Sequence, residues 1–441
     1  MTHPPRKGSL LVIFLTVFID LLGFGMVLPL LPIYGRQFAA KYGWADEQVG
    51  WTVGLLMSSF SAMQFLFLPI WGRASDRFGR RPILLIGLAG STLFYLGFAI
   101  ATSMQSLAGL FVTRIGAGIA GATIATAAAY IADTTTKEKR AKGMALVGAA
   151  FALGFTLGPS LGVVALLAGG DIALSPWPGY LASALSGLAF VLAAFLLPES
   201  IEPGLNAEKR SLFDLNALRD ALSIPTVGLL LGTSFVAVFS FANFESTLSL
   251  QIEKIVHQFE AAPEASGALP RLIAKSRSWG YDQPDEIKLV AIFAVFAYLG
   301  LTLTLAQGFL VRRLADKLSE GVMATIGGAA ATAGFLLLAR AATNDDFNLL
   351  LVAMAIEVVG FAFVNPSLQS LLSRRSRADE QGGVLGLGQS VSSLARIMGP
   401  VAGIRLFAYR PDSPYYFAAV LMALAVVAIL WTARHGRDAD G

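Results

Sequence analysis

Long apolar runs separated by short polar segments dominate the sequence. Residues 10–32 hold one charged side chain and residues 83–101 hold none. A helix needs about 20 apolar residues to cross the hydrocarbon core of a bilayer, and a core helix rarely carries so long a run. The pattern therefore predicts an all-α membrane protein with twelve transmembrane helices. The predicted spans are residues 10–33, 48–71, 82–103, 107–132, 142–168, 177–197, 225–250, 287–311, 321–341, 347–372, 382–407 and 414–433.

Composition agrees with a membrane protein and excludes several classes of site. Mean hydropathy is +0.65, and only 14% of the residues are charged, against about 25% in soluble chains. The chain has no cysteine, which excludes disulfides and thiolate metal sites. Its histidines, at positions 3, 257 and 435, lie outside the spans. We expect no enzyme activity, no metal, no cofactor, no ATP drive and no nucleic-acid partner.

The placement of positive charge predicts the orientation. If the N-terminus is cytoplasmic, Lys and Arg number 21 on the inner side and 10 on the outer side, with two more inside spans. Cytoplasmic loops of membrane proteins carry this excess. We therefore expect both termini in the cytoplasm of a multi-pass protein of the cell membrane, the inner membrane if the source is bacterial. The first apolar run holds Asp20 and is too long for a cleaved signal peptide.

Two features recur at nearly constant offset and suggest a duplication. Asp76 corresponds to Asp316, and Gly158-Pro159 corresponds to Gly399-Pro400. We expect two pseudo-symmetric bundles of six helices, residues 1–198 and 225–441, joined by a cytoplasmic linker at 199–224. Parallel repeats of this kind occur in transporters whose substrate site lies near the midplane. A coincidence of common membrane motifs is the alternative.

A long extracytoplasmic loop is expected at residues 251–286. Three prolines and mixed charges break the apolar pattern there. A loop of this length is functional or partly disordered, and the sequence does not decide between these. A short amphipathic helix near residues 264–276 would also fit the pattern.

The segment 72–81, which we call the signature turn, lies between two predicted spans. It combines glycines with charged residues, and a weaker copy recurs at 312–320. Its arginines can pair with acids such as Asp133, while Asp76 is expected just before a helix N-terminus, where negative charge is favoured. The simpler explanation is that four positive charges keep the turn inside the cell. The candidate gate residues are Gly72, Asp76, Arg77, Gly79, Arg80, Arg81, Asp133, Arg140 and Asp316.

With these motifs the chain resembles the major facilitator superfamily, and within it the drug:proton antiporters of the tetracycline-efflux-like branch. The resemblance covers nearly the whole chain. It rests on the signature turn, on the first-span pattern from Asp20 to Pro32, on Arg114 followed by Gly118, and on Pro198-Glu199-Ser200. It implies alternating access, with the signature turn at a cytoplasmic gate. One departure is Phe94, where tetracycline exporters carry an aspartate, so tetracycline is not the expected cargo.

Asp20 is the first candidate for proton coupling or for binding a substrate cation. It lies about ten residues into its span, which is about 15 Å deep at 1.5 Å per residue. A charged aspartate at that depth costs roughly 2.5–3.5 kcal/mol. A structural hydrogen bond between helices is the alternative role. The resemblance gives Arg114 a part in proton transfer, with Asp20 as its candidate partner, and a structural ion pair is the alternative.

Glu357 lies at a similar depth in the tenth predicted span. Asn365 follows at helical spacing, so both belong to one polar stripe that is expected to line the cavity. Glu357 would be a second titrating group or a cation-binding group, unless the stripe only packs helices. Arg396 could pair with Glu357 or contact an anionic substrate. Glu245 is expected nearer the outer interface, and Gln64 could line the path or only pack.

A ridge of small residues marks the fifth predicted span. Small residues let helices approach closely, and a proline can kink a helix. Relatives in the resembled family use such a ridge as a hinge between halves, although tight packing explains it equally well. The residues of the hinge prediction are Gly154, Gly158, Pro159, Gly162, Gly399 and Pro400.

These observations predict a proton-coupled secondary transporter that exports a small amphipathic or drug-like molecule. Its expected partners are that small-molecule substrate, protons and the lipid bilayer, and we expect a monomer. Transport of another solute, such as a sugar, a metabolite or a lipid, is one alternative. A membrane sensor or scaffold without flux is another.

Overall fold

The computed structural model is helical throughout the part of the chain that it describes. It describes residues 9–134, 150, 153–154, 156–167, 174–200, 225–261, 267–279, 283–315, 317–375 and 381–435. Within these ranges there is no β-strand. The predicted residues Arg140 and Asp316, the linker 201–224 and most of the fifth span before residue 153 lie outside them.

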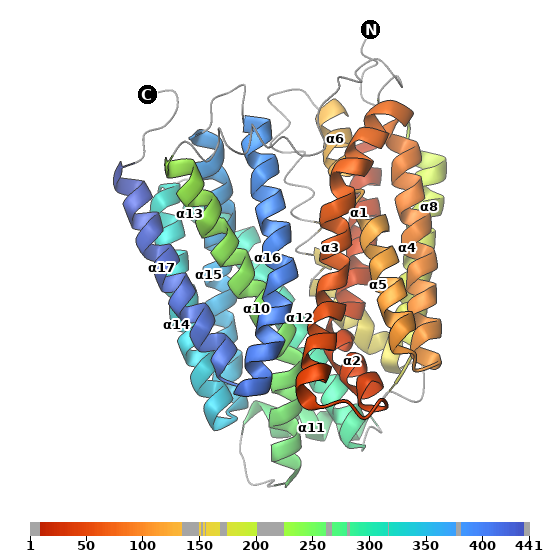
Figure 1. The fold of residues 1–441 in the computed structure, drawn as a ribbon, viewed down its shortest axis with the longest axis vertical. Coiled ribbons are helices and arrows are strands. Elements are labelled where there is room, and N and C mark those ends of the chain that lie inside the picture. The colour runs from red at the N-terminus through yellow and green to blue at the C-terminus, as the bar shows by residue number, and fades with distance from the viewer. Residues whose placement is uncertain are drawn as a thin grey trace. The chain divides into compact units, whose positions relative to one another are not determined.

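The helices follow one another along the chain (Figure 1). In the first half they are α1 Ser9–Val27, the 3-10 helix η1 Leu28–Leu30, α2 Leu31–Ala40, α3 Asp46–Phe78, α4 Arg80–Ser103, α5 Leu107–Gly121, α6 Ile124–Thr134, the helix Thr156–Leu167 and α8 Trp177–Leu196. In the second half they are α10 Pro225–Ala261, α11 Ala268–Ser278, α12 Pro284–Leu305, the π-helix η2 Ala306–Val311, α13 Arg312–Ala315, α14 Glu320–Asn344, α15 Phe347–Arg374, α16 Gln381–Tyr409 and α17 Ser413–His435.

The predicted membrane architecture is confirmed. In the described residues, 11 helices are long and apolar enough to cross a bilayer, and the shorter apolar helix Thr156–Leu167 falls within the remaining predicted span. Each coincides with one of the twelve spans expected from hydropathy. The fold class is therefore an all-α membrane protein.

The chain divides into two compact units. Unit 1 comprises residues 1–38 and 59–213, and unit 2 comprises residues 39–58 and 214–441. In unit 1, α4 packs against α5 and α8, and α1 packs against α8. In unit 2, α14 packs against α15 and α17, and α10 packs against α16. The division cuts α3 between Ser58 and Ser59.

Two connections differ from the sequence-based expectation. The helix α10 continues to Ala261, and α11 occupies 268–278, so most of the segment expected as a loop is helical. Buried residues such as Ile252, Ile255 and Val256 keep one face of α10 apolar past the expected membrane boundary. Hydropathy predicts where the membrane-spanning part of a helix ends. The helix itself continues beyond that point because its apolar face stays buried.

The signature turn is shorter than expected. The helix α3 runs on to Phe78 and α4 begins at Arg80, so Gly79 alone connects them, with φ at 101°. Asp76 therefore lies in the last turn of α3 and not in front of α4, which corrects the expected dipole contact. A backbone conformation of this kind is essentially restricted to glycine.

Candidate functional site

Asp20 lies on α1 and faces α4 within unit 1. Its Oδ1 atom is buried without a hydrogen-bond partner, and the side chain of Ser91 forms a hydrogen bond with the carboxyl group. One turn along α4, the hydroxyl of Tyr95 donates to the backbone oxygen of Asp20 at 3.5 Å. An acidic group in a helical span thus sits among few polar partners, with part of its hydrogen-bonding capacity unused.

A glycine brings Tyr95 to this site. A Cβ atom on Gly23 would lie 2.8 Å from Cε2 of Tyr95, so only glycine leaves room for the ring. The neighbouring Phe94 ring lies instead where a Cβ atom on Gly116 of α5 would be. The aromatic side chain that reaches Asp20 is therefore Tyr95, which the sequence analysis did not single out. Its spacing of four residues from Ser91 was the available signal.

Arg114 lies in the middle of α5 and is 2% exposed. Its guanidinium carbon lies 4.6 Å from the ring centroid of Phe60 and 5.6 Å from that of Phe24. Nε and Nη1 have no hydrogen-bond partner. Cations are attracted to the faces of aromatic rings, so these two rings, which the sequence analysis missed, stabilise the charge.

The expected ion pair between Asp20 and Arg114 is not among the ion pairs of the described residues. The side chain of Tyr95 lies close to both groups. Gln64, another candidate on α3, donates from Nε2 to the backbone oxygen of Gly121 at 3.2 Å. The structure thus gathers Asp20, Tyr95 and Arg114, while Gln64 is engaged with the end of α5.

A second group of charges lies within unit 2. Glu357 on α15 is 0% exposed, and neither of its carboxyl oxygens has a hydrogen-bond partner. Glu245 on α10 is close enough to interact electrostatically with Glu357, and also with Arg396 on α16. Arg396 thus lies near Glu245, and its expected contact with Glu357 stays a prediction.

Glu245 lies near the middle of α10 along the chain. Its expected place near the outer interface stays a prediction, because α10 runs on to Ala261 beyond the expected span. Its Oε1 atom is buried without a partner. Asn365 lies two turns beyond Glu357 on α15 and is partly exposed. Of the second-half candidates, the structure gathers the two glutamates and Arg396.

Two phenylalanines lie one helical turn from these glutamates. The rings of Phe241 on α10 and Phe361 on α15 are stacked, with centroids 4.2 Å apart and planes 19° apart. Phe241 precedes Glu245 by four residues, and Phe361 follows Glu357 by four. Residues four apart share one face of a helix, so α10 and α15 run antiparallel here and present an aromatic pair next to an acidic pair.

The signature turn forms an ion-pair cluster within unit 1. Arg80 pairs with Asp76 at 2.6 Å and with Asp133 of α6 at 3.0 Å. Its Nη1 atom also donates to Oγ of Ser75, and Glu199 accepts hydrogen bonds from the backbone N–H groups of Arg80 and Arg81. The predicted contact with Asp133 is therefore present, whereas the part played by Glu199 was missed. Arg77 stacks on the ring of Phe78, 5.3 Å from its centroid.

The glycine ridges pack against α1 in unit 1 and against α10 in unit 2. In unit 1, a Cβ atom on Gly158 would lie 2.8 Å from Cα of Gly25 on α1. In unit 2, a Cβ atom on Gly399 would lie 3.0 Å from the backbone nitrogen of Asn243 on α10. The corresponding glycines thus make corresponding contacts, which accounts for close packing. Their role as a hinge stays a prediction, as it does for Gly154, Pro159, Gly162 and Pro400.

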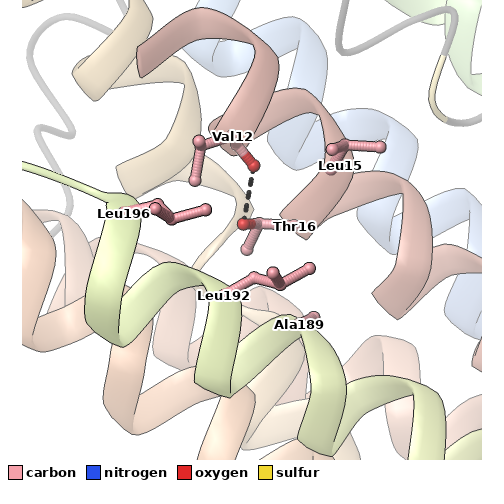
Figure 2. Close-up of a pocket in the computed structure, with 6 residues that line it drawn as sticks. All are labelled: Val12, Leu15, Thr16, Ala189, Leu192 and Leu196. Carbon is pink, nitrogen blue, oxygen red and sulfur yellow. Dashed lines mark hydrogen bonds between the residues drawn. The ribbon is translucent and has the colours of Figure 1, made fainter. Parts of the chain in front are cut away.

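A small apolar crevice lies between α1 and α8 (Figure 2). Val12, Leu15, Ala189, Leu192 and Leu196 line it, together with Thr16, whose hydroxyl donates to the backbone oxygen of Val12 at 2.8 Å. None of these six side chains is ionisable, so the crevice is separate from the charged groups that define the candidate site. Within the described residues, no group of His, Asp and Glu could hold a metal ion.

Comparisons with known proteins match nearly the whole chain. The family model of the Major Facilitator Superfamily matches residues 13–400 and 265–440. The tetracycline resistance protein of class C from Escherichia coli is 32% identical over 91% of this chain and 90% of its own length. Major facilitator superfamily domain-containing protein 10 from Bos taurus is 29% identical over 97% of this chain and 91% of its own length.

Solved structures agree in fold. The crystal structure of the human organic anion transporter MFSD10 superimposes with a TM-score of 0.67 at 23% identity, over 97% of this chain and all of that one. A D-xylose-proton symporter gives a TM-score of 0.70 at 17% identity, over 95% of this chain and 96% of that one.

Proposed function

Because the chain belongs to the major facilitator superfamily, and within it to the tetracycline-efflux-like branch, we propose that it exports a small amphipathic or drug-like molecule in exchange for protons. That it is a secondary transporter and not an enzyme follows from the family. The proposal adds proton coupling, the class of cargo and the direction of transport. Such a fold supports alternating access, in which the substrate site opens first to one side of the membrane and then to the other.

The environment of Asp20 is the observation that carries proton coupling. A low-dielectric environment disfavours the charged form of a carboxyl group, and one carboxylate oxygen of Asp20 is buried without a partner. Intramembrane carboxyl groups of this kind mark proton relays in transporters. Asp20 would bind a proton in one state and release it in another, with Tyr95 beside it.

The cargo class rests on the curated relatives and on the site. Several are tetracycline resistance proteins, which supports a drug-like molecule. The aromatic residues beside both charged groups, Phe24 and Phe60 in unit 1 and Phe241 and Phe361 in unit 2, suit an amphipathic molecule. Transport of another solute is the second candidate, because an organic anion transporter and a D-xylose-proton symporter share the fold.

The proposal includes placement in the cell membrane as a monomer with both termini in the cytoplasm. The excess of Lys and Arg on one side supports this orientation. It puts the cluster around Arg80 on the cytoplasmic side, where it would stabilise one state of the gate. The two bundles of six helices, 1–198 and 225–441, would then be the moving parts.

Resistance profiling tests the proposed direction and cargo. The chain is expressed in a bacterial strain that lacks its own efflux pumps, beside the Asp20→Asn variant at equal membrane abundance. We expect resistance to a set of amphipathic compounds, lost in the variant and abolished by a protonophore. Resistance that persists with the protonophore would contradict proton coupling, and increased sensitivity would indicate uptake in place of export.

A further inference from the structure

The short helix α11 presents a group of exposed cations at one end of unit 2. In its 11 residues it holds three basic side chains and no acidic one. We call Arg271, Lys275, Arg277 and the adjacent Trp279 the basic face of α11. All four residues are exposed, Trp279 to 48%, and Nζ of Lys275 lies 5.5 Å from the ring centroid of Trp279. The basic face thus combines positive charge with an accessible indole ring.

Packing on unit 2 fixes the direction of the basic face. The buried residues of α11 are Leu269, Ile273 and Ser276. With this side the helix packs against α12 and α15, and at its start the backbone N–H of Ala268 donates to Oδ1 of Asn348 on α15 at 2.9 Å. Arg271 and Lys275 are four residues apart and so share the side of the helix turned away from the buried one. The charge therefore points outward from unit 2.

The attachment to Asn348 places α11 at the level of the lipid headgroups. The helix α15 has 28 residues, which is about 42 Å at 1.5 Å per residue, whereas the hydrocarbon core is about 30 Å thick. Shared between the two ends, the excess carries the first turn of α15 about 6 Å past the core, into a headgroup layer of about 5–8 Å. Asn348 belongs to that turn, and tryptophan is enriched at this interface.

The position of these cations is not explained by topology. In Figure 1, α11 lies at the end of unit 2 away from α13, which is the outer end if both termini are cytoplasmic. Loops on that side carry few Lys and Arg near the spans. Other lysines at this end have acidic partners, Lys254 with Asp345 at 2.9 Å and Lys288 with Asp285 at 2.6 Å.

The basic face differs from these lysines because its charge is not neutralised. Among the residues that the structure describes, no carboxylate pairs with a cation of the basic face. Anions suited to such a surface are the phosphate groups of lipids, which arginine can bind with two parallel hydrogen bonds. Charge, depth and the exposed indole ring thus point to the same kind of partner.

We propose that the basic face of α11 binds the headgroups of anionic phospholipids in the leaflet around this end of unit 2. Arg271, Lys275 and Arg277 contact the phosphates, and Trp279 lies at the boundary between headgroups and acyl chains. The proposal goes beyond the proposed function and depends neither on the cargo nor on proton coupling. A soluble anion attracted by the same charges is the outcome that the experiment separates.

Quenching of Trp279 fluorescence measures the proposed contact. The purified full-length chain is reconstituted into phosphatidylcholine bilayers with a small share of phosphatidylglycerol or phosphatidylcholine that is spin-labelled near the headgroup end of its acyl chain. The difference between the unmodified chain and Trp279→Phe gives the emission of Trp279. We expect labelled phosphatidylglycerol to quench it more strongly. This preference should fall roughly fivefold for each of Arg271→Gln and Lys275→Gln, about 1 kcal/mol per cation, and Arg271→Lys should retain it.

A matched control removes a cation that already has a partner. Arg410 pairs with Asp412 at 2.7 Å, and Asp412 accepts a hydrogen bond from Thr343 near the end of α14, so this pair lies at the same end of unit 2. Arg410→Gln should keep the preference for phosphatidylglycerol. If the variants of α11 do not fold, the unmodified chain decides, because 1 M salt shortens the screening length to about 3 Å and should abolish the preference.

Three results would overturn the proposal. The first is equal quenching by the two labelled lipids in the unmodified chain. The second is a preference that survives both the double variant Arg271→Gln, Lys275→Gln and high salt. The third is loss of the preference in inorganic phosphate but not in sodium chloride of the same ionic strength, which would assign the basic face to a soluble anion. None of these results bears on proton-driven flux, so the proposed function is tested separately.

Discussion

Glu199 accepts a hydrogen bond from the backbone N–H of Arg80 at 2.8 Å, although 119 residues separate the two along the chain. Its other oxygen accepts from the backbone N–H of Arg81 at 3.1 Å. The first N–H groups of a helix lack partners within that helix, and Gly79, at the N-cap of α4, has no side chain to supply one. Glu199 therefore caps α4 from the end of the first half of the chain.

Replacement of Glu199 should measure the energy of this cap. We expect Glu199→Ala to lower the free energy of unfolding by about 1–2 kcal/mol, since it removes both a cap and a negative charge at a helix N-terminus. The melting temperature in detergent is the measurement. Glu47→Ala is the control, because its carboxylate is 70% exposed and pairs only at the surface. Equal melting temperatures for the two variants would contradict the capping role.

The two glycines of the signature turn should respond in opposite ways to alanine. Gly79 has φ at 101°, and a Cβ atom there would collide with the carboxylate of Glu199, so we expect Gly79→Ala to destabilise by roughly 1–3 kcal/mol. Gly72 is inside α3, and nothing lies within 4 Å of its Cβ position. Since alanine favours helix by about 1 kcal/mol over glycine, Gly72→Ala should be neutral or stabilising.

The melting temperatures of the two variants, measured side by side, show whether these glycines are required for steric reasons or for another role. A transport defect in Gly72→Ala with unchanged stability would show that Gly72 acts in the gate and not in folding. Equal destabilisation of both would contradict the assignment of the turn to Gly79 alone.

Hydropathy predicted the spans because lipid exposure determines composition. It did not predict that α3 and α10 run beyond them, because a helix that continues outside the membrane is stabilised by an apolar face and not by an apolar run. Ile252, Ile255 and Val256 follow that helical spacing and could have been recognised. Within the segment 251–286, the extension of α10 was therefore not expected, whereas α11 at Ala268–Ser278 agrees with the short helix allowed near residues 264–276.

The candidate acids could also be found from the sequence, since few charges interrupt the spans. Their neighbours could not. The approach of Tyr95 to Asp20 depends on Gly23, and the proximity of Arg396 to Glu245 depends on which faces of α10 and α16 meet. Both are contacts between segments far apart in the sequence, and the amino-acid sequence alone does not show which segments meet.

Alanine at Gly334 should disturb the packing of α14 against α15. The added Cβ would lie 2.6 Å from the backbone nitrogen of Glu357, which forces α14 and α15 apart. Overpacking of this kind costs about 1–3 kcal/mol, so we expect a lower melting temperature. Gly232→Ala, where nothing lies within 4 Å of the added atom, is the control. Unchanged stability in Gly334→Ala would contradict the packing described here.

Arg114 should not be replaceable by lysine. Its planar guanidinium stacks over Phe60 and Phe24, and a lysine ammonium is a compact and strongly hydrated charge that does not stack in this way. We expect Arg114→Lys to reduce proton-driven transport roughly tenfold or more, the loss of one cation–π contact of up to about 2 kcal/mol. Arg340→Lys, at an exposed position, should leave transport unchanged. Full activity in Arg114→Lys would show that positive charge alone suffices.

Proton-driven flux in reconstituted vesicles tests the central claim most directly. The purified chain is placed in liposomes with an imposed pH gradient, and movement of a compound identified by resistance profiling is followed for the unmodified chain, Asp20→Asn and Glu357→Gln. The account predicts uphill movement that follows the gradient in the unmodified chain, and downhill exchange without coupling to protons in Asp20→Asn. Undiminished gradient-driven accumulation in Asp20→Asn would contradict it.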